Sequence, residues 1–265
     1  MTVFLSELRQ YRRSLVAWAV GFAIAILFLY PVFESIIAGN ADDRAELEAL
    51  LEGNPTTQAL GVDPQYFFTS LGVYALLIAF LLLPAAVQGA GIGLGIITKE
   101  NVQNTADFLL TKPISRAGVY LSKGAAAMVA LFVTSTVFLA ASLVALIGND
   151  FAIDHFVLLF LVFPLVQLFF LVLGMTIGTL VSRLSAPLPV ALGIAFVLYV
   201  VGMFASVAQS NAARAFSPYK YFPSGDVLSG QGYAPLFVIL YVGWLAALGV
   251  IGFFIFVRKD VPTAR

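Results

Sequence analysis

Six long apolar tracts, separated by short polar stretches, dominate the chain. Each reaches or exceeds the roughly 20 helical residues needed to cross the apolar core of a bilayer. Lipid offers no hydrogen-bond partners to the backbone, so such tracts cross it as helices. The pattern therefore predicts an all-α integral membrane protein, with a single transmembrane domain over residues 1–265. The six predicted spans are Leu15–Ile37, Phe67–Ile97, Gly118–Ile147, Phe156–Val181, Leu188–Ala208 and Ala234–Val257.

Composition supports this class and excludes several functions. Hydrophobic residues make up 61% of the chain and charged residues only 11%, whereas soluble domains average roughly 45–50% apolar residues. The formal net charge is zero, so there is no broad basic field for nucleic acid. The sequence contains no cysteine, which excludes disulfides, thiol catalysis and cysteine-based metal sites.

The basic residues predict the orientation. Of the 14 lysines and arginines, 11 fall on the side of the membrane that holds both termini. Cytoplasmic loops carry an excess of such residues, so both termini are expected in the cytoplasm of a multi-pass cell-membrane protein. The 11 are Arg9, Arg12, Arg13, Lys99, Lys112, Arg116, Lys123, Arg183, Arg258, Lys259 and Arg265.

Two sizeable loops are then external. The first, Ala38–Tyr66, contains leucines at helical spacing opposite acidic residues, which predicts a short amphipathic surface helix. The second, Gln209–Tyr233, is rich in turn-forming residues and in aromatic residues. Aromatic side chains of this kind suit the headgroup layer of a membrane.

Two further features have a structural and a functional interpretation. The glycine-rich stretch Gly89–Gly95 matches neither phosphate-binding consensus and lies inside an apolar span, so we expect it to serve helix packing.

The only histidine, His155, lies beside Asp150 and Asp154. A solvated loop is the expectation there, because a metal site would need further ligands from elsewhere. No nucleotide-binding motif, serine–histidine pair or carboxylate dyad is found in the sequence, so the chain is not expected to be an enzyme.

Gln88 and Gln167 are polar residues within predicted spans. Polar groups in a membrane commonly form hydrogen bonds between helices. They also mark substrate pathways. Both interpretations stand for this pair: interhelical hydrogen bonding, or a translocation path.

The sequence ENVQNTADFLLTKPISR, Glu100–Arg116, stands out between two apolar tracts and is called here the polar segment. Val102, Ala106, Leu109 and Leu110 recur at helical spacing, which predicts a short amphipathic helix over Glu100–Lys112. A proline disfavours helix at the residue before it, so the helix should end ahead of Pro113. Such a helix could lie on lipid or dock on a cytoplasmic protein.

The polar segment resembles the cytoplasmic motif of ABC-2-type transporter permeases. That motif has an acidic residue, then Gly-Thr-Leu-Glu, a leucine-rich triplet and Pro-hydrophobic-Ser-Arg. Asp107 and Phe108 are conservative replacements, while Asn104 and Ala106 stand where the family has Gly and Leu. The residues that match directly are Glu100, Thr105, Leu109, Leu110, Pro113, Ser115 and Arg116.

The resemblance covers essentially the whole chain and implies a permease subunit of an ATP-driven transporter, with export as the expected direction. It implies that separate ATPase subunits hold ATP and Mg²⁺, and that this chain needs no cofactor. A second permease chain, identical or related, and membrane lipids are the other implied partners. The basic stretch around Arg9–Arg13 resembles the family's amino-terminal interfacial helix. The docking residues implied are Glu100, Thr105, Asp107, Phe108, Leu109, Leu110, Pro113 and Arg116.

Two other classes of function remain as alternatives. A stand-alone secondary carrier or channel would favour ionisable residues near mid-membrane or an inverted repeat. A non-transporting membrane scaffold would use the same amphipathic helix to hold a cytoplasmic partner. A neighbouring ATPase gene would favour the transporter over both.

Overall fold

The computed structural model describes residues 2–37, 65–103, 115–181 and 184–258, and six long helices account for most of them. All six are long and apolar enough to cross a membrane, which confirms the six predicted spans. No strand occurs within the described ranges. The six helices are α1 (Thr2–Ile37), α4 (Ser70–Gln103), α6 (Arg116–Ala145), α7 (Ile153–Leu180), α8 (Pro187–Val207) and α11 (Pro235–Arg258).

The first helix begins earlier than the apolar pattern predicted. α1 is continuous over 36 residues from Thr2 to Ile37. The amino-terminal basic stretch therefore forms the first turns of the spanning helix, and the structure does not show it as an interfacial helix of its own. The long second span is confirmed, since α4 has 34 residues. Its neighbours are also longer than the roughly 20 residues that a bilayer needs: α6 has 30 residues and α7 has 28.

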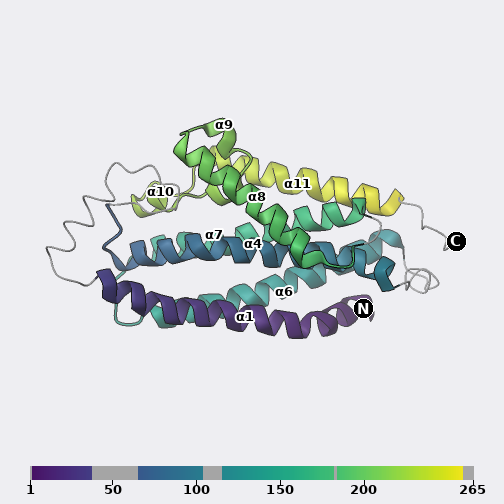
Figure 1. The fold of residues 1–265 in the computed structure, drawn as a ribbon, viewed down its shortest axis with the longest axis horizontal. Helices are drawn as coiled ribbons and strands as arrows, with labels where there is room; N and C mark the ends of the chain where they lie inside the picture. Colours follow the sequence, from purple (N-terminus) through teal and green to yellow (C-terminus); the bar gives the residue numbers. More distant parts are fainter. Residues whose placement is uncertain (1, 38–64, 104–114, 182–183, 259–265) are drawn as a thin grey trace.

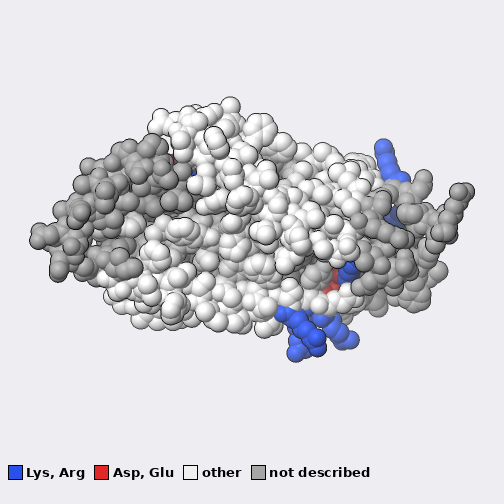
Figure 2. Space-filling view, viewed as in Figure 1, with Lys and Arg blue, Asp and Glu red and all other residues white. Residues whose placement is uncertain are grey.

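The helices form three layers (Figure 1). α1 packs on α6, α4 packs on α7 in the middle layer, and α8 and α11 cover the other side of that layer. We call the end where α1 begins and α11 ends the base; α4 also ends there and α6 begins there. We call the opposite end the far end. Figure 2 shows an uncharged belt along the middle of this face, with basic side chains gathered toward the base.

Close packing of α4 against α7 depends on glycine. A Cβ at Gly89 would lie 2.3 Å from the carbonyl oxygen of Gln167, and one at Gly174 would lie 2.5 Å from that of Ala90. No side chain fits at such distances, so the two backbones touch directly. Gly91 on the same helix faces α8, where an added Cβ would lie 3.6 Å from a methyl carbon of Leu188. Helix packing by this glycine-rich stretch is confirmed, and α4 continues without a break through Pro84.

Aromatic side chains fill the core between the α1–α6 and α4–α7 layers. The ring of Phe138 on α6 stacks on Phe163 of α7, with centroids 4.2 Å apart. Phe22 of α1 meets the same Phe163 ring edge-on at 4.9 Å. Such pairs add about 0.5–1.5 kcal/mol beyond the burial of their area. The three helices are thus held together near the centre of the bundle.

The aromatic residues of the second loop do not all face outward, as contact with headgroups would require: Phe216 is exposed, whereas others lie in the core. The loop folds into α9 (Asn211–Arg214), the 3₁₀ helix η1 (Pro218–Lys220) and α10 (Ser224–Leu228) at the far end. Tyr221 and Phe222 are buried against the bundle, where their rings meet Phe237 and Tyr241 of α11. They are core residues, because the short helices turn them inward instead of toward headgroups. The amphipathic helix predicted in Ala38–Tyr66 lies outside the described residues.

Candidate functional site

Most of the predicted docking residues lie outside the described part of the chain. Thr105, Asp107, Phe108, Leu109, Leu110 and Pro113 all fall in 104–114. Glu100 is in the last turns of α4, although its side chain is not described. Arg116 is the first residue of α6, and the Ser115 hydroxyl caps that helix by accepting a hydrogen bond from the Gly118 N–H at 3.1 Å. The polar segment therefore connects α4 to α6 at the base.

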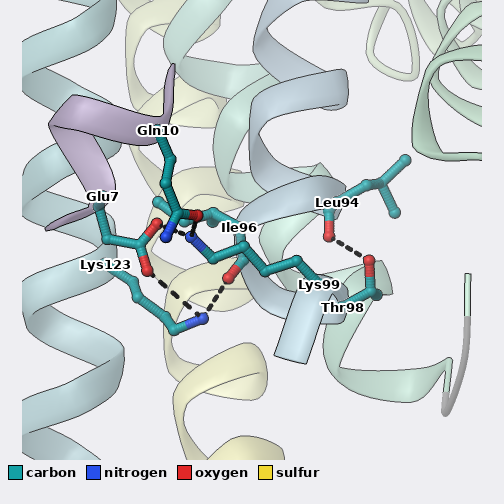
Figure 3. Close-up of polar contacts among 7 residues, drawn as sticks. All are labelled: Glu7, Gln10, Leu94, Ile96, Thr98, Lys99 and Lys123. Atoms are coloured by element: carbon teal, nitrogen blue, oxygen red, sulfur yellow. Dashed lines mark hydrogen bonds and ion pairs between the residues drawn. The ribbon is translucent and has the colours of Figure 1, made fainter. Parts of the chain in front are cut away.

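A buried charge cluster lies at the base, beside the polar segment. The Glu7 carboxylate of α1 accepts a hydrogen bond from the Lys99 ammonium of α4, and its other oxygen lies 3.9 Å from the Lys123 ammonium of α6 (Figure 3). Gln10 also accepts from Lys99, at 2.8 Å. Lys123 donates to the carbonyl oxygen of Ile96. We call Glu7, Gln10, Lys99 and Lys123 the base cluster.

Burial makes these contacts mutually dependent. Glu7 is 3% exposed and Lys123 is 1% exposed, so neither charge is solvated by water. A buried pair of this kind adds little net stability, but removing one partner costs about 3–5 kcal/mol because the other charge stays buried alone. Charged side chains from α1, α4 and α6 therefore contact one another at the base.

Sequence reasoning missed this cluster. Lys99 and Lys123 were interpreted only as orientation signals, and Glu7 was given no role. One signal was available: Lys123 falls inside the predicted span Gly118–Ile147, where an ionisable residue is expensive and usually paired. Its partner could not be identified, because Glu7 and Lys123 are 116 positions apart in the sequence (123 − 7).

The two glutamines within the spans are in direct contact. Gln167 of α7 donates to the Gln88 side-chain oxygen of α4 at 2.7 Å, and Gln88 donates to the Thr134 hydroxyl of α6 at 3.0 Å. Ser135 donates to the Gln167 oxygen at 3.0 Å. We call these four residues the central network. Gln88 and Gln167 are fully buried, so each would otherwise leave polar groups unpaired in an apolar core.

Of the two interpretations of Gln88 and Gln167, interhelical hydrogen bonding is confirmed. The bonds form a chain of donors and acceptors from Ser135 to the carbonyl oxygen of Ala130, which accepts from Thr134 at 3.1 Å. A place for the two glutamines on a translocation path stays a prediction. The central network therefore joins α6, in one layer, to α4 and α7 in the next.

The histidine is part of a helix start. His155 lies in the first turn of α7, with its Nε2 3.8 Å from an Asp154 oxygen, and Asp154 is well exposed. Among the described residues, no group of three or more His, Cys, Asp or Glu side chains is placed to hold a metal ion. The geometry gives His155 no ligand set.

A partly buried cationic pair holds the loop at the far end. The Arg214 guanidinium lies 3.7 Å from the ring centroid of Phe237, and its Nε donates to the Lys220 carbonyl oxygen at 2.7 Å. Burial lowers the pKa of Lys220 to about 8, with a smaller effect in the same direction from Arg214. Burial also lowers the pKa of Arg214, against an opposing effect of Asp226. Arg214 therefore links α9 to η1 and to α11.

Comparison with known proteins agrees with this architecture. Residues 1–261 match the family described as ABC-2 family transporter protein, which covers all six membrane helices and the polar segment. A search of curated proteins finds no match. Since the family match extends over nearly the whole chain, this protein belongs to the ABC-2 family of transporter proteins.

Proposed function

We propose that the chain is the membrane permease of an ATP-driven exporter, and that the helix predicted over Glu100–Lys112 docks on a separate ATPase subunit. The family match over residues 1–261 carries this proposal, because it covers the polar segment together with the six spans. The fold supports it. α4 and α6 flank the polar segment, and each packs against other helices of the bundle.

The proposal assigns the remaining parts to partners. The ATPase subunit holds ATP and Mg²⁺, since the sequence of this chain has no phosphate-binding motif. A second permease chain, identical or related, completes the transporter. The base, where most of the basic residues gather, faces the cytoplasm of the cell, and the remaining apolar surface contacts lipid.

The first experiment tests docking. The complex is purified from its native host through a tag on this chain, with wild type compared to the double variant Leu109→Asp and Leu110→Asp. Each buried leucine contributes about 1.5–3 kcal/mol, so losing both should weaken ATPase association at least about 100-fold. The matched control is Leu50→Asp with Leu51→Asp, the same change in the predicted external loop. Docking is refuted if both double variants retain the ATPase equally.

Charge reversal separates docking from a helix that lies on lipid. Glu100→Lys and Asp107→Lys each add positive charge, which strengthens attachment to an anionic membrane by about 1 kcal/mol per basic residue. The same changes should weaken a protein interface built around those carboxylates. Loss of the ATPase with the chain still inserted supports docking. Retention of the ATPase in both variants would favour the lipid-surface helix.

A further inference from the structure

The base cluster brackets the polar segment on both sides. Lys99 immediately precedes Glu100, the first residue of the segment, and Lys123 lies seven residues after Arg116, the last. Seven residues are about 10 Å of helix, or two turns. Both lysines converge on one carboxylate, Glu7, which belongs to a different helix (Figure 3). A displacement at either end of the segment therefore acts on the same side chain of α1.

Two polar clusters join the α1–α6 and α4–α7 layers, besides the hydrogen bond from the Tyr30 hydroxyl to the Ser70 carbonyl oxygen at the far end. The central network is neutral and lies in the middle of the bundle, whereas the base cluster is charged and lies at the end where the polar segment begins. Direct packing between α1 and α4 is limited compared with the packing inside each layer. The base cluster is thus a polar contact by which α4 holds α1 at that end.

We propose that Glu7 is a positioning residue that makes α1 follow α4 and α6 when a docked ATPase moves the polar segment. This inference rests on the proposed function. The charge pairing matters because separating α1 from α4 would leave Glu7 and Lys123 as buried charges with fewer partners. The three helices therefore move as one body at the base during the ATP cycle.

The test measures whether α1 keeps its distance from the α4–α7 layer. Spin labels are placed on cysteines that replace Arg9 of α1 and Leu180 at the end of α7, both exposed positions at the base of a chain without native cysteine. The permease–ATPase complex is measured without nucleotide and after trapping with ATP and vanadate. In wild type, the distance should be the same in both states.

Removing the carboxylate should release α1. In Glu7→Gln, we expect the wild-type distance in the absence of nucleotide and a shifted or broadened distance after trapping, because the polar segment then moves α4 without α1. Glu7→Asp keeps a negative charge between Lys99 and Lys123 and should keep the constant distance. Glu34→Gln, the same chemical change at the far end of α1, is the control and should behave as wild type.

Each other outcome overturns the inference. A nucleotide-dependent distance in wild type would show that α1 does not follow α4. A constant distance in both wild type and Glu7→Gln would show that the cluster transmits nothing. A distance already altered in Glu7→Gln without nucleotide, and insensitive to trapping, would show a purely structural role. Failure of the ATPase to co-purify with wild type would overturn the proposed function and this inference together, whereas the three preceding outcomes leave the proposed function intact.

Discussion

Replacing Gly93 with alanine should force α7 away from α4. A Cβ at this position would lie 2.3 Å from the Leu171 carbonyl oxygen and 2.7 Å from the Met175 amide nitrogen. Both are backbone atoms of a helix, so no side chain can rotate aside to relieve the overlap. Ordinary contact begins at 3.4 Å, and α7 must therefore retreat locally by about 1 Å.

The change in the free energy of unfolding caused by Gly93→Ala combines two destabilising effects with one stabilising effect. Overpacking of a tight interface costs about 1–3 kcal/mol. A retreat of α7 also stretches the 2.7 Å bond between Gln167 and Gln88, and hydrogen bonds between membrane helices are worth about 0.6–1.7 kcal/mol each. Alanine in a helix gains about 1 kcal/mol over glycine. The net expectation for Gly93→Ala is a loss of about 1–3 kcal/mol.

The assay is reversible unfolding of the purified chain in mixed micelles, followed by circular dichroism. The control is Gly243→Ala on α11, where a new Cβ would meet no described residue within 4 Å beyond its own stretch of helix. That variant should be neutral or more stable by up to about 1 kcal/mol, since only the helix preference changes. If Gly93→Ala unfolds at the same free energy as Gly243→Ala, the direct backbone contact between α4 and α7 is refuted.

A double-mutant cycle sharpens this test. If the methyl group of Gly93→Ala already breaks the central network, adding Gln167→Leu should cost less than it does in wild type. Coupled neighbours show such non-additivity, at about 0.5–3 kcal/mol. Strict additivity would mean that α4 accommodates the methyl group without moving α7.

Three further predictions concern the network, the far end and the topology. Gln167→Leu should lower the free energy of unfolding by about 1–3 kcal/mol, because it strands buried polar groups on α4 and α6; an unchanged value would deny the network a role in stability. Burial lowers the pKa of Lys220 to about 8 from its usual 10.5, so between these values the unfolded chain binds more protons. Stability should therefore rise with pH across this window by up to about 3 kcal/mol, and Lys220→Met should remove the rise; a rise that survives the substitution contradicts the assignment. Cysteines in place of Asp43 and Gln231 should react with an impermeant thiol reagent added outside the cell, and one in place of Lys112 should not. Equal labelling at all three would overturn the orientation.

The sequence alone determined the architecture at the level of single helices. Continuous apolar tracts must span a membrane as helices, so their number follows from the pattern of hydrophobic residues. The glycine spacing in Gly89–Gly95 also identified a packing face, since four residues return to the same side of a helix. Hydrogen bonding of Gln88 and Gln167 between helices was one of two interpretations that the sequence left open, and it rested on the cost of leaving an amide unpaired in lipid. These are local rules, and each needs only one segment of chain.

Only the tertiary structure decided which segments meet. Periodicity places Lys123 on a face of its helix but cannot choose Glu7 as its neighbour, because the two residues belong to different helices that meet only in the fold. Tyr221 and Phe222 are aromatic residues in a loop, and by composition alone such residues suit the headgroup layer. Their burial depends on where α11 packs, because their rings contact Phe237 and Tyr241 of that helix. The continuity of α1 through its basic first turns is a further case, since Glu7 is neutralised there by lysines of α4 and α6. Contacts between distant segments are fixed by packing and charge pairing across the bundle, which no single stretch of sequence contains.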